Sequence, residues 1–388
     1  MPIVNRIAEF QGDLSAWRQD LHRHPELLYE VHRTAATVAD RLRSFGLDEV
    51  TEGVGRTGVV GVIRGRSNAS GRVVGLRADM DALPIRETTG KPYASTVDGL
   101  MHACGHDGHS VMLLGAARYL AETRNFDGTA VVIFQPAEEG GAGGKAMVDD
   151  GLMDRWGIQQ VYGMHNLPGL AVGDFHTRPG PITASTDEFV IEIAGRGGHA
   201  ALPHETIDPI IVGCGLTEAL QTIVSRSVDP IESAVVSLTT FHAGQAHNVI
   251  AETATLGGTV RTLKPEIRDL VEKRMVDLVG GIATAHGATI TLDYKRSYPV
   301  TRNHPYETGL AAAVAAEIVG TERVTADAPP IMGGEDFSYM LEARPGAFVF
   351  VGNGDSADLH NSAYDFNDEV IPTGSSFWVR LVERIMPP

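Results

Sequence analysis

Two hydrophobic periods alternate along the first half of the chain. Apolar positions with helical spacing cover residues 13–45, with Gly46 as the stop, and residues 107–122. Short apolar runs bounded by glycine or polar residues predict buried strands at 59–63, 73–76, 130–134 and 161–164. Because strands alternate with helices, we predict an α/β fold in which a mostly parallel central sheet carries helices on its faces.

The pattern changes in the middle of the chain. Strands and helices follow one another there in the order β-α-β-β-α-β, which is typical of a ferredoxin-like unit. The predicted elements lie at 188–194, 207–224, 234–240, 251–262, 265–286 and 288–294. We therefore expect residues 182–298 to form an inserted satellite domain. Residues 1–181 and 299–388 would form one discontinuous domain, which resumes near Asn303 with helices at 306–319 and 374–386.

Acidic and histidine side chains stand where four of the predicted strands end. They are Asp79 and Asp81, Glu138 and Glu139, His165, and His360 after the apolar run 348–351. In open α/β sheets, ligands bind beyond the carboxyl ends of the strands. One or two such coincidences arise by chance, so four favour a functional site at this edge of the sheet.

The segment from Met101 to His109 is rich in metal-binding side chains. It packs three histidines, a carboxylate and one of the chain's two cysteines into nine residues. Thiolate, imidazole and carboxylate are the groups that bind transition metals. Cys104 and His106 are two residues apart, so in an extended segment both point to the same side. A solvated polar loop with an incidental cysteine is the alternative, but the segment contains no Lys or Arg to balance such groups.

Together these positions supply more ligands than one metal ion needs. The candidates are Cys104, His106, Glu138, Glu139, His165 and His360. A catalytic zinc ion takes three protein ligands and a water, so this set favours two ions that share a bridging ligand. Two ions roughly 3.5–4 Å apart can clamp the attacking and leaving oxygens of a hydrolysis.

Glu138 and Glu139 form a pair of adjacent carboxylates. Adjacent residues of an extended chain point to opposite sides, so one can bind a metal while the other faces the substrate. A carboxylate beside the metal can act as a general base toward an activated water. A surface acidic pair is the alternative interpretation.

The composition of the chain limits which binding partners and which cellular compartment we expect. The 388 residues carry a formal net charge of −17, which argues against a nucleic-acid partner because phosphate binding requires clusters of Lys and Arg. Residues 1–10 contain no long apolar run, so we expect no signal peptide. No window holds 18 consecutive apolar residues, so we expect no membrane span. Two distant cysteines, Cys104 and Cys214, fit a reducing, cytoplasmic compartment.

Seven motifs together resemble the M20 metallopeptidase superfamily. The resemblance is to its amidohydrolase branch, which contains hippurate hydrolases, auxin-conjugate hydrolases and N-acetyl-amino-acid deacetylases. The motifs are LHRHPE at 21–26, RADMDALP at 77–84, MHACGHDGH at 101–109, QPAEEGG at 135–141, MHN at 164–166, GGEDF at 333–337 and LHN at 359–361. They extend over almost the whole chain and are highly specific in combination.

The resemblance implies a role for each candidate. Two divalent transition-metal ions (zinc, manganese, nickel or cobalt) would be held by Cys104, His106, Glu139, His165 and His360, with Cys104 as the bridge. Glu138 would be the general base. Related peptidases have a His-x-Asp motif and a bridging Asp, where this chain has Arg77-Ala78-Asp79 and Cys104. Asp79 would then orient the site from behind the ligands. His22, His24, His102 and His109 are expected to make local structural hydrogen bonds instead.

The resemblance also assigns functions to the inserted domain. That domain would mediate a homodimer and act as a lid. His199 would stabilise the oxyanion, Asn248 would contact the substrate, and Arg261 would bind the substrate carboxylate as a fork. Without the resemblance, His199 and Asn248 would be interpreted as polar loop residues and Arg261 as a charge on a strand surface.

The activity that follows is hydrolysis of the amide bond of N-acyl amino acids by metal-activated water. Such an enzyme would have a small-molecule substrate and neither a nucleic-acid nor a membrane partner. A dipeptidase or carboxypeptidase on the same scaffold is one alternative. A homologue that binds metal without catalysis is the other, although Glu138 and all five predicted ligands are intact.

Overall fold

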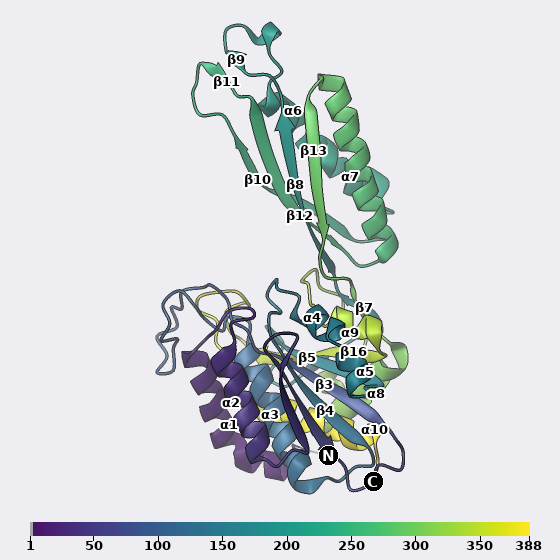
Figure 1. Cartoon of the computed structure of the whole chain (residues 1–388). Coiled ribbons are helices and arrows are strands. Elements are labelled where there is room, and N and C mark those ends of the chain that lie inside the picture. Colours follow the sequence, from purple (N-terminus) through teal and green to yellow (C-terminus); the bar gives the residue numbers. More distant parts are fainter. Residues whose placement is uncertain (1–2) are drawn as a thin grey trace. The chain divides into compact units, whose positions relative to one another are not determined.

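The computed structural model describes residues 3–388 (Figure 1). Residues 1 and 2, part of the stretch expected to carry no signal peptide, lie outside the described residues. The chain divides into two compact units. Unit 1 comprises Met1–Ile182, Arg302–Pro329 and Asp336–Pro388, and unit 2 comprises Thr183–Thr301 and Pro330–Glu335. Within the described part of the chain, no helix is both long and apolar enough to cross a membrane.

An eight-stranded sheet forms the centre of unit 1, in the order β1-β2-β4-β3-β5-β16-β6-β15. The neighbouring strands β4, β3, β5 and β16 run parallel, whereas β1 and β2 add an antiparallel edge. The strands are β1 Glu49–Val54, β2 Gly58–Arg64, β3 Val73–Asp79, β4 Thr129–Gln135, β5 Gln160–Pro168, β6 Phe175–His176, β15 Val324–Thr325 and β16 Gly346–Gly354. The mainly parallel sheet confirms the predicted α/β fold.

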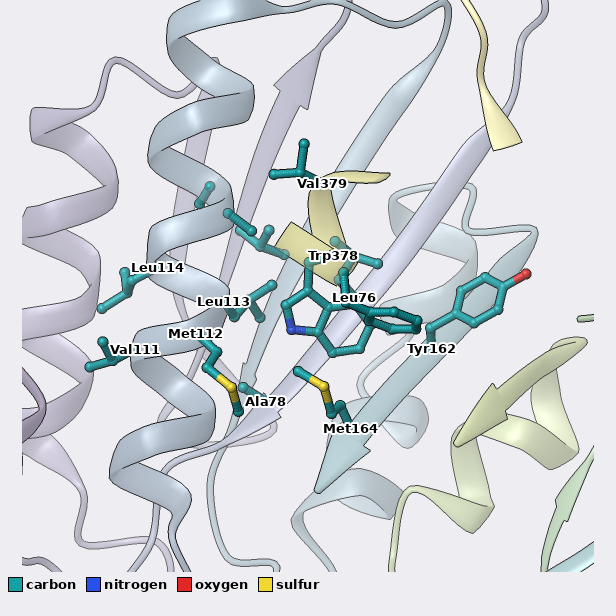
Figure 2. Close-up of a cluster of buried hydrophobic side chains, with 14 of the residues drawn as sticks. Leu76, Ala78, Val111, Met112, Leu113, Leu114, Tyr162, Met164, Trp378 and Val379 are labelled. Carbon is teal, nitrogen blue, oxygen red and sulfur yellow. The ribbon is translucent and has the colours of Figure 1, made fainter. Parts of the chain in front are cut away.

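Helices bury apolar side chains against the sheet of unit 1. One buried cluster joins the strands to α1 Asn5–Arg23, α2 His32–Ser44, α3 His106–Thr123, α8 Pro305–Val319 and α10 Ile371–Ile385. A second joins them to α4 Gly143–Asp149, α5 Leu152–Arg155 and α9 Ser338–Ala343. Figure 2 shows the first cluster, where the indole of Trp378 on α10 lies among Leu76 of β3, Leu113 of α3 and Met164 of β5. This packing fixes the strand ends that carry the candidate site.

The N-terminal region differs from the pattern prediction. The single helix expected at 13–45 is two helices, because Pro25 lacks a backbone N–H and biases His24 away from helical geometry. Strand β1 was missed because most of its side chains are exposed or half-buried, so its sequence carries no clear apolar alternation.

Unit 2 contains a four-stranded antiparallel sheet in the order β10-β12-β8-β13. Its strands are β8 Ser185–Ala194, β10 Ala234–Ala243, β12 Thr253–Thr262 and β13 Thr289–Arg296, with a short pair formed by β9 Gly198–His199 and β11 Val249–Ile250. The helices α6 Pro209–Thr222 and α7 Pro265–His286 pack on the sheet through one apolar cluster. The main elements follow the predicted β-α-β-β-α-β order.

The chain also contains several short elements. They are β7 Gly180–Thr183, β14 Thr301–Asn303, the 3-10 helices Pro203–Glu205, Thr321–Arg323 and Asp368–Val370, and the π-helix Ile223–Ser227.

A buried polar contact joins α1 to the start of α3. His22 Nδ1 lies 2.9 Å from Asp107 Oδ2, and His22 Nε2 lies 3.4 Å from Glu87 Oε2. Arg18 Nη1 approaches the same Asp107 oxygen at 3.4 Å. Burial alone would lower the pKa of His22, but the hydrogen bond to Asp107 and the Glu87 carboxylate raise it to about 9. His102, whose ring stands 6.2 Å from that of His22, has its pKa lowered to about 4 by burial.

We predict a pH-dependent contribution of His22 to stability. Because its folded pKa exceeds the unfolded value of 6.5, the stabilisation is complete below pH 6.5 and is lost as the pH rises through about 9. The full contribution is on the order of 3 kcal/mol. The urea midpoints of the wild type and His22→Asn should therefore differ most near pH 6 and converge near pH 10.

The exposed His32 provides a matched control. His32→Asn should shift the midpoint little at any pH. A constant gap between the wild type and His22→Asn from pH 6 to pH 10 would contradict the charged His22–Asp107 pair.

Candidate functional site

The carboxyl edge of the unit 1 sheet gathers the predicted metal ligands. Cys104 ends an irregular segment, and His106 begins α3 directly after Gly105, whose φ of 89° turns the chain there. His165 lies in β5, where its Nε2 is 3.4 Å from Cys104 Sγ. The donor atoms of Cys104, His106 and His165 all lie within 4.8 Å of one another, so they could hold one metal ion.

A second cluster shares Cys104 with the first. The donor atoms of Cys104, Glu139 and His360 also lie within 4.8 Å of one another. Glu139 Oε1 is 3.3 Å from His360 Nε2 and 3.9 Å from His106 Nε2. Because Cys104 belongs to both clusters, the geometry is compatible with a thiolate that bridges two ions. The first cluster is buried, whereas the side chain of His360 is 54% exposed.

Glu138 lies beside these clusters. It is buried, and its carboxylate stands within 4.8 Å of the donor atoms of His106 and Glu139. It follows β4, like Glu139, but it does not belong to either of the clusters that contain Cys104. This is the relation expected of one carboxylate that binds metal and a neighbour that accepts a proton.

Asp81 lies at the predicted edge of the sheet, although the sequence assigned no role to it. Its two carboxylate oxygens accept hydrogen bonds from the backbone N–H groups of Glu138 at 2.9 Å and Glu139 at 3.1 Å. Asp81 Oδ1 also lies 3.5 Å from His106 Nδ1, so Nε2 is on the other side of that ring, 3.7 Å from Asp79 and 3.9 Å from Glu139. Asp81 thus holds the glutamate pair and orients a predicted ligand. Its position two residues after Asp79, on the same side of an extended segment, was the available signal.

Asp79 is fully buried at the end of β3 and takes part in a chain of hydrogen bonds. It accepts from Arg77 Nη1 at 2.8 Å and from His109 Nδ1 at 2.6 Å. The backbone N–H of Asn166 donates to His109 Nε2 at 2.9 Å, so the proton of that imidazole is on Nδ1. Both ring nitrogens of His109 are therefore occupied, which agrees with its expected structural role. Asp79 contacts His106 Nε2 less closely, at 3.7 Å.

Electrostatics favour a cation among these groups. Burial and the nearby Glu139, Glu138 and Asp79 raise the pKa of the Cys104 thiol well above its usual range. Burial alone would lower the pKa of His106, but Asp79 and Asp81 raise it to about 10. Burial lowers the pKa of His165 well below its usual value, which keeps this imidazole neutral.

The polar atoms and donor types also fit metal ions. Nε2 of His106 and Oε1 of Glu139 are buried without a hydrogen-bond partner among the described residues. Burying such atoms without a partner is costly, and metal coordination removes that cost. Thiolate and imidazole donors select divalent transition metals over magnesium or calcium.

The predicted substrate contacts lie in unit 2. His199, in β9, is exposed, and its Nδ1 accepts a hydrogen bond from Ala201 N–H at 3.0 Å. In the neutral ring the proton is then on Nε2, which can donate. The backbone oxygen of Asn248 accepts from Ala200 N–H at 3.1 Å, so the first two predicted residues are neighbours. Arg261 lies separately in β12, and burial lowers the pKa of its guanidinium.

Comparison with known proteins adds family evidence. The model of peptidase family M20/M25/M40 matches residues 75–384. The chain is 42% identical over 386 residues to the hippurate hydrolase of Campylobacter jejuni, covering 100% of both chains. It is 39% identical to thermostable carboxypeptidase 2 of Saccharolobus solfataricus, covering 97% of both.

A solved structure shares the same architecture. The crystal structure of a dinuclear metal-binding peptidase of the M20 family from Bacillus subtilis superposes with a TM-score of 0.85 at 35% identity. The match covers 98% of this chain and 99% of that one. The chain therefore belongs to peptidase family M20/M25/M40 and is a hydrolase of its amidohydrolase branch.

Proposed function

We propose that the protein hydrolyses the amide bond of N-acyl amino acids with the help of two divalent transition-metal ions. The observation that carries this proposal is the pair of donor clusters that share Cys104, with the Glu138 carboxylate beside them. The 42% identity to a hippurate hydrolase over the whole chain supports an N-acyl amino acid as the substrate. The metal-binding relative from Bacillus subtilis supports the dinuclear centre.

In this mechanism the buried cluster of Cys104, His106 and His165 would hold one ion, and Cys104, Glu139 and His360 would hold the other. The chemistry that bound ions supply is polarisation of the substrate carbonyl and acidification of water. Glu138 accepts a proton from the attacking water and returns it to the leaving nitrogen. Asp81 fixes the backbone of the glutamate pair, so the proton acceptor keeps its position relative to the ligands.

Unit 2 would supply the substrate contacts. We propose that His199 donates a hydrogen bond to the oxyanion, that Asn248 makes a further substrate contact and that Arg261 binds the substrate carboxylate. A homodimer formed through this unit is also proposed. Several large apolar side chains of unit 2 are exposed, which favours such an assembly. They are Val190, Leu202, Ile210, Ile211, Ile231, Val249, Val276 and Ile331.

A carboxypeptidase is the second candidate function. The identity of 39% to a thermostable carboxypeptidase over 97% of both chains is close to the identity to the hippurate hydrolase. Both reactions cleave an amide next to a carboxylate, so the same metal centre and base would serve either.

A substrate panel tests the proposal. Acetyl, benzoyl and indole-acetyl amino acids should be hydrolysed with a higher kcat/KM than unblocked dipeptides of the same C-terminal residue. A chelator should abolish the activity, and divalent zinc, manganese, nickel or cobalt should restore it. A preference for unblocked peptides would favour the carboxypeptidase, and full activity in the fully chelated protein would overturn the mechanism.

Glu138→Gln should separate catalysis from metal binding. The amide keeps the shape of the side chain but cannot accept the proton, so kcat should fall by about 10²–10⁴-fold. Metal content, measured by elemental analysis, should remain that of the wild type.

The matched control is Glu307→Gln, a buried glutamate on α8 that accepts from Gln160 Nε2. Its rate should stay close to that of the wild type. A near-normal rate for Glu138→Gln would remove Glu138 from the role of base.

Metal stoichiometry tests the bridge. Cys104→Ala should bind fewer than two ions per chain, because Cys104 belongs to both clusters. Cys104→Asp should retain two ions, since a carboxylate can also bridge. His360→Ala should lose one ion, the one in the more exposed cluster. Cys214→Ala removes an exposed thiol in α6 and serves as the control. Two ions bound to Cys104→Ala would contradict the bridging role.

A further inference from the structure

The residue after His165 is bonded at each of its polar groups. Asn166 is fully buried in β5. Its backbone oxygen accepts from His165 Nδ1 at 2.6 Å, and its backbone N–H donates to His109 Nε2 at 2.9 Å. Its side-chain Nδ2 donates to the backbone oxygen of Cys104 at 2.6 Å, and its Oδ1 accepts from Tyr364 Oη at 2.7 Å. Two of these four bonds end on predicted metal ligands.

The bond to His165 selects the tautomer of that ligand. Because Nδ1 carries the proton that Asn166 accepts, the lone pair of His165 is on Nε2, the nitrogen 3.4 Å from Cys104 Sγ. The carbonyl of Asn166 thus fixes both the orientation and the protonation of the ring.

The side-chain amide of Asn166 fixes the turn that carries Cys104. A Cβ atom on Gly105 would lie 2.3 Å from Asn166 Nδ2 and 2.6 Å from Tyr364 Oη. Glycine at 105, with its φ of 89°, therefore lets the backbone press against the Asn166–Tyr364 pair. The position of the Cys104 carbonyl, and with it the thiol, is set by this contact.

Tyr364 extends the contact to a third ligand segment. Its backbone N–H donates to Asn361 O at 3.0 Å, and the backbone N–H of His360 donates to Ala103 O at 2.8 Å. The segment with His360 is therefore tied both to the Cys104 turn and to β5. The phenol of Tyr364 is fully buried, and burial raises its pKa well above the usual value, so it remains a neutral donor.

We propose that Asn166 is a positioning residue that, together with Tyr364, sets the relative positions of the Cys104 thiol and the His165 imidazole. Its side chain supports the bridging ligand and its backbone supports the buried ligand. The inference rests on the proposed metal centre and deepens it, because it names the residues outside the ligand set on which affinity for the ions depends.

Cobalt binding to the metal-free full-length protein tests this role without reference to turnover. Added Co²⁺ should give a thiolate-to-cobalt charge-transfer band with a stoichiometry of two in the wild type. Asn166→Ala removes the bonds to Cys104 and Tyr364, together with the contact of Nδ2 with His109 Nε2 at 3.0 Å, and should weaken Co²⁺ binding, measured by chelator competition, by about 10–100-fold. The intensity of the charge-transfer band should change as well, because the thiolate moves relative to the ion.

Tyr364→Phe is the milder variant, since it removes one oxygen atom and keeps the ring. It should shift affinity in the same direction by less, and the double variant should be no weaker than Asn166→Ala alone, because both act through one contact. Tyr162→Phe is the matched control. Tyr162 is a buried tyrosine in β5, the strand of Asn166, and its Oη lies 3.4 Å from Gln160 Oε1. Its cobalt spectrum should equal that of the wild type.

The outcomes separate this inference from the proposed function. If the wild type binds two Co²⁺ ions and Tyr364→Phe and Asn166→Ala match it in affinity and spectrum, the positioning role is overturned and the metal centre stands. If Asn166→Ala does not fold, Tyr364→Phe decides the question by the same measurement. If the wild type gives no thiolate–cobalt band, the proposed metal centre and the positioning role are both overturned.

Discussion

One buried cation holds the carboxyl edge of the unit 1 sheet together. The guanidinium of Arg77 donates to Asp79 at 2.8 Å, to Asp336 at 3.0 Å and to Gln135 at 2.8 Å, and the four side chains are fully buried. Separating a buried charge from its partner leaves an uncompensated ion, which costs on the order of 3–5 kcal/mol. Arg77 therefore links the end of β3 to the end of β4 and to the segment before α9. Asp79, one of its partners, also accepts the hydrogen bond from His109.

This arrangement leaves the site with more acidic than basic groups. Arg77 offsets only part of the charge of Asp79 and Asp336, whereas Glu138 and Glu139 lie near the Cys104 thiol and Asp81 binds the backbone N–H groups of both glutamates. Besides burial, this excess of negative charge raises the pKa of Cys104, because each nearby carboxylate disfavours the charged thiolate. Divalent cations bound at the proposed centre would restore the balance and allow the thiol to ionise, which would link metal affinity to proton affinity.

The sequence predicted the sheet, and the gathering of donor side chains at its edge, better than the hydrogen bonds behind them. Strand ends could be located from apolar runs, and the rule that ligands bind at the carboxyl edge of the sheet then brought Glu139 and His360 together although they are far apart along the chain. The roles of Asp81 and Asn166 depend on contacts between distant residues, and the spacing of apolar residues along the chain does not predict such contacts. The bond between Asn166 and Tyr364, for example, joins residues 198 positions apart. Exposed strand β1 and the break at Pro25 were missed because local exposure and a single proline outweighed the apolar pattern.

The adjacent residues Glu138 and Glu139 can take the two different roles proposed for them because their backbone is held in place. Asp81 binds both of their backbone N–H groups, so the turn cannot rotate to exchange the two side chains. A Cβ on Gly143 would lie 1.6 Å from Pro136 O, so the chain that follows is packed closely against the chain before Ala137. Ala137 itself has a φ of 55°, a conformation that its surroundings must impose. The backbone would thus hold the proposed ligand, Glu139, apart from the proposed base, Glu138.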